Sequence, residues 1–502
     1  MPTRIAAFLR TSWAPLLVAV VGTAVMFAFS GLYGMHRDEM YFIVAGRHPA
    51  FGYVDQPPLT PLLAAAEVQL LGVSAMAVRV LPTLAYGVVV LLSAVIAREL
   101  GGGRLAQLVA ALTVAVSGWI AVAHLASTQT FDILGWLALL LVLVRILRGG
   151  DPRLWLLAGL VAGITLENKN LLVYLAVGLV AGMLLARRLD LLRSRWLWAG
   201  AAVALAIWLP NLLWQAAHGW PQLEMARIIA ARSGANNRSS LIPLQVLLAG
   251  PFLFPIFLAG LWWLLRSKES SSWRPIGWAY LVSLAVIFVT KGKGYYNGGL
   301  VPVIIAAGSV PAARWLQGGA RAIRFAKSAT YVGATVLSGL LIVSFALPVV
   351  PASRFPTSGL ARVNAEAVST YGWPSFVDQV EAVSDQLTST EREHAAIVAG
   401  NHGEASALEL LGGPGLPPVY SGHNSFWDWG PPDDRRTTTI LVTSRSDAGT
   451  HFERWLGRCR RAASIDLGFP PGITEEQGAG VWVCGPRTAP WREIWSSFRH
   501  LD

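Results

Sequence analysis

Long apolar runs constrain this chain more than any other feature of its sequence. Segments such as Trp13–Phe29, Val80–Ala97 and Phe131–Leu147 are almost free of charge, and runs of this length are typical of transmembrane helices. Charged residues make up only 14% of the 502 residues, against about 25% in an ordinary globular domain. A chain of this composition cannot cover a soluble core with polar surface. We therefore predict an all-α polytopic membrane protein that carries a small α/β domain at its C-terminus.

Eleven apolar segments are predicted to cross the membrane. Their approximate bounds are 13–32, 77–97, 105–123, 131–147, 154–167, 171–186, 196–214, 244–265, 275–290, 298–312 and 329–349. The segments 154–167 and 171–186 are short, and they flank the polar sequence Glu167-Asn168-Lys169-Asn170. They are either two spans or one long helix with a buried polar kink, and the second alternative reverses every later segment.

The distribution of charge predicts the orientation. Residues 1–349 contain 27 Lys and Arg against 11 Asp and Glu, whereas residues 350–502 contain 13 against 18. With a cytoplasmic N-terminus, 18 of those 27 basic residues fall in cytoplasmic segments, where Lys and Arg concentrate. An odd number of spans then places the C-terminal part outside. The net charge of +11 thus belongs to the membrane part, and we expect no nucleic-acid partner. The first apolar run lacks a small-residue cleavage site, so we expect it to be retained as a helix.

Residues 350–502 are predicted to form the extracytoplasmic α/β domain, and residues 1–349 the transmembrane domain. Ala395–Ala399 and Thr439–Thr443 are typical of short buried strands, and Asp378–Leu387 of an amphipathic helix. Both cysteines of the chain, Cys459 and Cys484, lie in this domain. An oxidising compartment allows a disulfide between them; the alternative is two buried thiols.

The densest polar stretch lies between the first two spans, in Gly34–Tyr41 and Gly52–Leu59. Residues 33–76 are too polar to cross, so we expect interfacial helices at the outer leaflet. This arrangement brings Asp38, Glu39 and Asp55 close to lipid headgroups. Neighbouring carboxylates suit general-base catalysis and also divalent-cation binding. The alternative is that Asp38 and Glu39 pair with Arg37 and cap a helix.

A second candidate site follows the ninth span, at Thr290–Asn297. The ammonium groups of Lys291 and Lys293, separated by a glycine, and the hydroxyls of Tyr295 and Tyr296 suit a bound phosphate. An ordinary basic loop with interfacial tyrosines is the alternative.

Three further residues are candidates. Lys169, between two short spans, needs an anionic partner or ligand, and Glu167 beside it is the simple alternative. His124 and Asp132, between the third and fourth spans, are accessory candidates, although Asp132 also suits the N-terminal charge of a helix. The loop 215–243 is either an amphipathic lid or a basic surface beside anionic lipid.

In their order along the chain, these motifs resemble those of the GT-C glycosyltransferases. The resemblance covers residues 30–310 and is carried by Arg37-Asp38-Glu39, Asp55-Gln56-Pro57-Pro58, Asp132, Lys169 and Lys293-Gly294-Tyr295-Tyr296. It is strongest to the bacterial protein O-mannosyltransferase-like group, which includes the lipid A aminoarabinose transferases and the Rgt-type galacturonosyltransferases. The tail segments Tyr371–Pro374, Gly400–Ala405 and Tyr420–Asn424 resemble the C-terminal domain of many bacterial members.

The resemblance implies a GT-C fold in the bacterial cytoplasmic membrane and a polyprenyl-phosphate-linked sugar as donor. It implies an inverting transfer outside the membrane to a hydroxyl of a lipid, a cell-envelope glycan or a protein. Asp38 matches the catalytic base, Asp55 a second acid at the acceptor site, and Lys293 and its neighbours the groups that hold the phosphate. The aminoarabinose transferases have Glu-Lys before Pro-Pro where this chain has Asp55-Gln56, so we expect Lys169 or Lys291 to supply the missing charge.

A transporter or flippase of lipid-linked intermediates is the alternative function. Such proteins usually carry inverted repeats with matched broken helices, and the sequence has no clear internal repeat. The polar residues also collect at one end of the predicted spans, which favours a one-sided active site.

Overall fold

A computed structural model describes residues 2–445 and 448–501. By their packing, the residues divide into two compact units. The helical unit contains the chain up to Ser30, Gln56–Thr60 and Arg79–Leu347; the tail unit contains Gly31–Asp55, Pro61–Val78 and the chain from Pro348 onward. Most of the segment between the first two apolar runs, all but Gln56–Thr60, is thus grouped with the tail, whereas the sequence division at 349/350 placed it with the membrane part.

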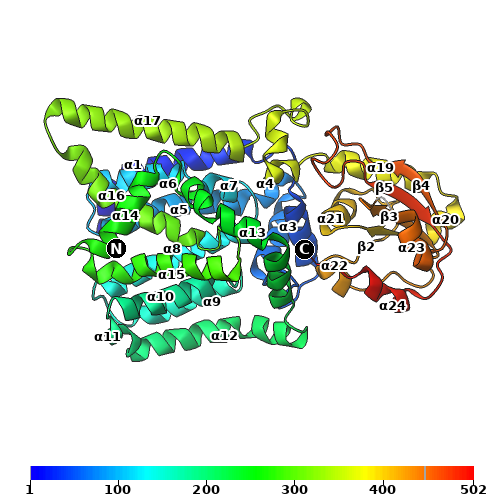
Figure 1. Cartoon of the computed structure of the whole chain (residues 1–502), viewed down its shortest axis with the longest axis horizontal. Helices are drawn as coiled ribbons and strands as arrows, with labels where there is room; N and C mark the ends of the chain where they lie inside the picture. Colours follow the sequence, from blue (N-terminus) through cyan, green and yellow to red (C-terminus); the bar gives the residue numbers. More distant parts are fainter. Residues whose placement is uncertain (1, 446–447, 502) are drawn as a thin grey trace. The chain divides into compact units, whose positions relative to one another are not determined.

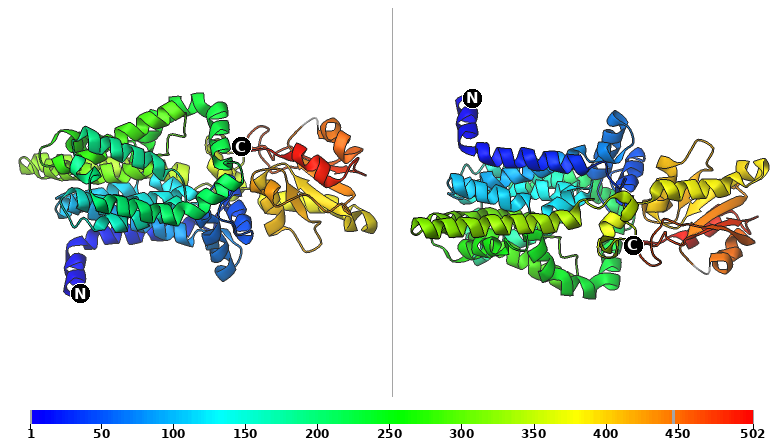
Figure 2. Two further views of the ribbon diagram at one scale, coloured as in Figure 1. Left: turned by 90° about the horizontal axis from the view of Figure 1, so that it is seen from below. Right: turned by 90° about the horizontal axis from the view of Figure 1, so that it is seen from above.

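The helical unit consists of helices that run in roughly the same or the opposite direction (Figures 1 and 2). Its helices are α1 (Pro2–Phe29), α5 (Val80–Glu99), α6 (Arg104–Ala115), α7 (Trp119–Ala123), α8 (Thr128–Leu147), α9 (Leu154–Leu166), α10 (Leu172–Leu185), α11 (Leu189–Leu192), α12 (Arg195–Ala217), α13 (Pro221–Ala249), α14 (Phe254–Arg266), α15 (Arg274–Thr290), α16 (Val301–Gln317) and α17 (Arg321–Ala346). Figure 1 shows α12 and α17 at opposite edges of this unit. In each of the two helices, only 11% of the most apolar 18-residue stretch is buried.

Among the described residues, six helices are long and apolar enough to cross a membrane, or up to seven if the bent pair α13–α14 is one span. Eleven spans were predicted, and each overlaps a helix. The remaining four correspond to the shorter apolar helices Trp13–Phe29, Arg104–Ala115, Leu154–Leu166 and Leu172–Leu185. The chain is a multi-pass membrane protein.

The predicted span 244–265 is wrong as a single straight helix, because α13 and α14 are bent by 100°. Gly250, at the break, has a φ of 88°, a conformation that glycine adopts without steric cost. Pro251 follows it and cannot donate the backbone hydrogen bond of a continuing helix. Most of the predicted loop 215–243 is also helical, since α13 begins at Pro221.

The helices α9 and α10 run in opposite directions between the same two ends of the unit. At one end Arg188, just after α10, donates from Nη1 to the carbonyl of Leu147, the last residue of α8, at 3.3 Å. At the other end Asn168, just after α9, donates from Nδ2 to the carbonyl of Thr128, the first residue of α8, at 2.7 Å. The segment 154–186 is therefore two antiparallel helices, not one kinked helix.

The tail unit is built around a five-stranded sheet in the order β2-β1-β3-β5-β4 (Figure 1). Its strands are β1 (Ala395–Ala399), β2 (Val419–Ser421), β3 (Thr438–Thr443), β4 (Cys459–Ser464) and β5 (Gly480–Cys484). Its principal helices are α2 (Arg37–Arg47), α3 (Leu59–Leu71), α4 (Ala75–Val78), α18 (Ala365–Val368), α19 (Trp373–Asp385), α20 (Ser389–Glu393), α21 (His402–Leu411), α22 (Ser425–Asp428), α23 (Ala448–Leu456) and α24 (Trp491–Ile494). Both predicted strands are confirmed. The predicted helix 378–387 begins earlier, at Trp373, because Pro374 suits the first turn of a helix.

The topology of the sheet creates a crevice beside β1 and β3. These strands are parallel, and the chain leaves β1 toward β2 but leaves β3 toward the other edge. Ligands of open α/β sheets bind where the strand order diverges in this way, beyond the carboxyl ends of the strands. A cavity of about 360 Å³ lies there, with Asn401 after β1 and Ser444 after β3 in its lining.

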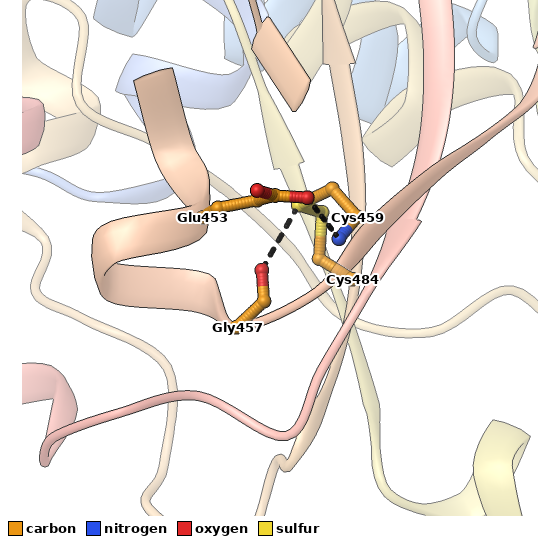
Figure 3. Close-up of a disulfide and its surroundings, with 4 residues drawn as sticks. All are labelled: Glu453, Gly457, Cys459 and Cys484. Atoms are coloured by element: carbon orange, nitrogen blue, oxygen red, sulfur yellow. Dashed lines mark hydrogen bonds between the residues drawn. A yellow bond between two sulfur atoms is a disulfide. The ribbon is translucent and has the colours of Figure 1, made fainter. Parts of the chain in front are cut away.

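A disulfide joins Cys459 and Cys484, which face each other on the antiparallel strands β4 and β5 (Figure 3). The backbone N–H of Cys459 donates to the carboxylate of Glu453 at 3.3 Å. The disulfide alternative is therefore confirmed over two buried thiols, and the bridge ties together one edge of the sheet.

Candidate active site

Glu39 and His36 form the N-terminal cap of α2. The Nδ1 atom of His36 accepts the backbone N–H of Asp38 at 3.0 Å, and the backbone N–H of His36 donates to Glu39 at 2.7 Å. This reciprocal pattern is a capping box. Glu39 is fully buried. The sequence left open that Asp38 and Glu39 cap a helix; the side chain of Glu39 does so, and that of Asp38 does not.

Asp38, in α2, contacts His402, the first residue of α21, within the tail unit. His402 Nε2 lies 3.1 Å from Asp38 Oδ1, and 48% of the Asp38 side chain is exposed. Burial by itself would raise the pKa of Asp38, but the hydrogen bond with His402 and the charges of His402 and Arg37 lower it well below its usual range. Asp38 is therefore ionised throughout the neutral and mildly acidic range.

Within the tail unit, Arg37 joins this end of α2 to the part of the chain after Pro348. Its Nη1 atom donates to Glu475 at 2.8 Å, and its backbone N–H donates to the carbonyl of Ser369 at 3.1 Å. Its Nε atom lies 3.9 Å from Asp38 Oδ1. Arg37 thus adds positive charge beside Asp38 while its main hydrogen bonds are structural.

Asp55 lies on the same side of α2 and accepts a hydrogen bond from the hydroxyl of Tyr41 at 3.0 Å. The ring of Tyr41 packs against the ring of His402 with centroids 5.0 Å apart. Burial raises the pKa of Asp55 to about 6, and the charge of Asp38 adds to the effect, while His402 and Tyr41 oppose it. The two carboxylates therefore have opposite shifts within one cluster, a pattern that separates their acid–base roles.

The acidic residues do not form a ready cation site. Among residues 2–445 and 448–501, no three His, Cys, Asp or Glu side chains gather in a way that could hold a metal ion. The described residues therefore provide no donor set of this kind for a divalent cation at Asp38, Glu39 and Asp55.

A second polar cluster lies in the helical unit, where α8 begins and α9 ends. Lys169 donates from Nζ to Gln129 at 3.1 Å, and it lies close enough to the buried carboxylate of Asp132 to interact with its charge. Asp132 accepts a hydrogen bond from Trp136 at 3.0 Å. Lys169 and Asp132, which lie 37 positions apart in the sequence, are thus brought together.

Lys293 belongs to the same cluster, and Lys291 does not. The ammonium groups of Lys169 and Lys293 lie 5.5 Å and 6.0 Å from the ring centroid of Tyr295. Lys291 ends α15 with a left-handed φ of 56°, and its side chain packs over Gly234 of α13.

Tyr296 and His124 are the remaining two candidates in the helical unit. The ring of Tyr296 packs against that of Tyr174 with centroids 5.8 Å apart. His124 is buried at the end of α7, with Arg79 as a charged neighbour.

Asn297, beside the tyrosines, is fully buried, and within the described part of the chain its amide has no hydrogen-bond partner. Lys169, Lys293, Gln129 and Asn297 thus offer donors that suit an anion.

Sequence reasoning missed His402, Tyr41 and Gln129 as parts of these clusters. His402 stood in a quoted tail motif, Gly400–Ala405, yet nothing local connects it with Asp38, which lies 364 residues earlier. Tyr41 lies three residues after Asp38, on the same face of α2, and this spacing was the one available signal.

Comparisons with known proteins bear on the fold of the chain. Residues 55–214 match the model of the family described as dolichyl-phosphate-mannose-protein mannosyltransferase. No curated protein matches the chain in sequence. Several solved structures resemble it over most of its length, among them the following three.

The structure of ArnT from Cupriavidus metallidurans bound to undecaprenyl phosphate has a TM-score of 0.54 and 16% identity, covering 94% of this chain and 98% of that one. The arabinofuranosyltransferase AftD from Mycobacteria has a TM-score of 0.52 and 14% identity, covering 96% and 42%. The oligosaccharyltransferase of Archaeoglobus fulgidus tethered with an acceptor peptide has a TM-score of 0.51 and 11% identity, covering 82% and 64%. The chain therefore has the GT-C fold.

Proposed function

We propose that this protein is a membrane glycosyltransferase that moves a sugar from a polyprenyl-phosphate donor to a hydroxyl of a lipid, a cell-envelope glycan or a protein. The observation that carries the proposal is the cluster in which Asp38 lies 3.1 Å from His402 Nε2 and Asp55 accepts a hydrogen bond from Tyr41 at 3.0 Å. In this cluster the pKa values of the two carboxylates are shifted in opposite directions. The similarity to ArnT, which was solved with undecaprenyl phosphate, supports the donor class. The reaction takes place on the extracytoplasmic face of the bacterial cytoplasmic membrane, with the N-terminus inside.

The two carboxylates divide the acid–base work. Asp38, which stays ionised, accepts a hydrogen bond from the acceptor hydroxyl and orients it. Asp55, with a pKa of about 6, takes the proton, because a general base works best when its pKa lies near the working pH. The resemblance to the GT-C glycosyltransferases implied Asp38 as the base; the shifted pKa values favour Asp55 for this step.

The covalent step is a single displacement. The acceptor oxygen loses its proton to Asp55 and forms a bond to the anomeric carbon of the sugar. The bond from that carbon to the phosphate oxygen breaks, and the polyprenyl phosphate leaves with the electron pair. Attack from the side opposite the phosphate inverts the configuration at the anomeric carbon.

Lys169 and Lys293 hold the donor phosphate in this proposal. The ammonium groups of Lys169 and Lys293, 5.5 Å and 6.0 Å from the centroid of the Tyr295 ring, can donate charge-assisted hydrogen bonds to phosphate oxygens. They also stabilise the negative charge that develops on the leaving phosphate. The missing Lys at Gln56 is then compensated by Lys169 and not by Lys291.

Asp38→Asn in proteoliposomes tests the proposal. Wild type and variant are supplied with a panel of radiolabelled polyprenyl-phosphate sugars and an envelope extract, and Asp433→Asn, at an exposed residue of the tail, is the control. We expect the Asp38 variant to lose roughly 10²-fold or more in rate at an unchanged melting temperature. Full activity in Asp38→Asn contradicts the assignment of the site.

A further inference from the structure

His402 is the tail residue in direct contact with Asp38, and its surroundings constrain its protons. It is the first residue of α21 and is buried. One ring nitrogen, Nε2, lies 3.1 Å from the Asp38 carboxylate. An ionised carboxylate only accepts hydrogen bonds, so Nε2 carries a proton in this contact.

His423 determines the state of the second ring nitrogen. The Nδ1 atom of His423 accepts the backbone N–H of His402 at 3.0 Å, so this nitrogen carries no proton. The Nδ1 atom of His402 lies 3.2 Å from that same acceptor. Two unprotonated nitrogens at this distance would face each other with their lone pairs. The contact is favourable only when Nδ1 of His402 also carries a proton.

We infer that His402 is the positioning residue that orients Asp38 and keeps its carboxylate ionised, and that His423 holds His402 in the doubly protonated form this task requires. The inference rests on the proposed function, because Asp38 there orients the acceptor hydroxyl. It goes further by assigning a part in the reaction to two histidines of the C-terminal tail.

The rings are held rigidly. His423 is 1% exposed and stacks on His500 with centroids 4.7 Å apart and planes 5° apart. The ring of His402 packs against the ring of Tyr41, with centroids 5.0 Å apart. Because the ring of His402 is already ordered, little conformational entropy is lost when it hydrogen-bonds to Asp38. Asp38 is therefore held in one orientation before the acceptor binds.

The charges around His402 are consistent with a cation at this position. Asp38 and Asp55 face it from the α2 segment, and both carboxylates interact with its charge. Arg37 lies beside Asp38 and is bound to Glu475, and His36 lies beside Glu366. Each of these two further basic groups therefore has its own acidic partner. One oxygen of Asp38 faces His402, and the side chain remains half exposed toward an acceptor.

Nitrogen NMR tests the protonation state without any need for activity. The full chain is labelled with ¹⁵N-histidine in lipid nanodiscs at about pH 7, and His402→Gln identifies the signals of His402. We expect both ring nitrogens of His402 to carry protons. His423→Phe, which keeps a ring against His500, is expected to remove the proton from Nδ1. A wild-type His402 with one unprotonated nitrogen, or an unchanged His402 spectrum in His423→Phe, overturns the inference.

The matched control is His394→Gln. His394 directly precedes β1, whereas His402 follows its end, so the control changes a histidine near the opposite end of the same strand. We expect it to remove its own signal and to leave the signals of His402 unchanged.

The pH dependence of kcat/KM separates positioning from a merely structural role. His402→Gln keeps an N–H donor but loses the charge, so the pKa values of Asp38 and Asp55 rise. We expect the acidic limb of the profile to move upward by about one pH unit, with no shift in His394→Gln. A structural role would lower the melting temperature and leave the limb in place. If wild type transfers no sugar, the proposed function fails while the NMR result stands; if sugar is transferred but His402 is singly protonated, only this inference fails.

Discussion

Transfer by this protein is expected to lose rate below about pH 6, because Asp55 then takes up a proton. Burial raises the pKa of Asp55 to about 6, and the charge of Asp38 adds to that shift. The folded protein therefore binds this proton more readily than a free aspartic acid does. The carboxylate form, which can accept a proton from the acceptor, is present above the shifted pKa and is lost as the pH falls through it.

The expected size of the effect follows from one titrating group. With a pKa of about 6, Asp55 is half ionised at that pH and roughly one tenth ionised one unit lower. The value of kcat/KM should therefore be constant above about pH 7 and fall about tenfold for each unit below pH 6. Asp38 adds no second limb, because its own pKa lies well below this range.

The assay is initial-rate transfer in proteoliposomes between about pH 4.5 and pH 8, with samples returned to pH 7 to exclude unfolding. Wild type should show the acidic limb, and Asp55→Asn should be slow at every pH with no limb near pH 6. An Asp55→Asn enzyme with the wild-type rate and the same inflection would refute the assignment of Asp55 as the base.

Three further outcomes are expected. Lys293→Met should raise the KM for the donor roughly tenfold or more through loss of a charged hydrogen bond to phosphate, whereas Lys291→Met should leave it unchanged; equal effects would place the phosphate elsewhere. Cys459→Ser should destabilise the tail by about 3 kcal/mol, as expected for cysteines separated by 25 residues, and an unchanged melting curve would contradict this. Gly308→Ala should lower the melting temperature by overpacking, because its Cβ would lie 1.9 Å from a carbonyl oxygen, while Gly333→Ala, with nothing within 4 Å, should not.

Local patterns explain which parts of the fold could be predicted. The strand Ala395–Ala399 was predicted with the bounds that the structure has, because a short run of buried apolar residues between polar segments has few alternatives. The capping role of Glu39 also follows from local spacing, since it lies three residues after His36.

Long-range packing explains what the sequence did not reveal. The contact of Asp38 with His402 depends on how α2 meets α21, and no pattern within either segment indicates it. The distinction between Lys291 and Lys293 depends on the turn after α15, where a left-handed residue directs one side chain over α13 and leaves the other beside Tyr295. The bend between α13 and α14 was signalled by Gly250-Pro251, but the surrounding apolar run favoured a single span.

The fate of the lipid donor tests the central claim most directly. A polyprenyl-phosphate sugar labelled on both the sugar and the lipid is placed in proteoliposomes with acceptor, and free polyprenyl phosphate and glycosylated acceptor are counted together. We predict that wild type forms the two products in equal amounts and that Asp38→Asn forms both roughly 10²-fold more slowly or slower still. Intact labelled donor that crosses the bilayer without loss of its sugar would contradict the transferase and favour a transporter.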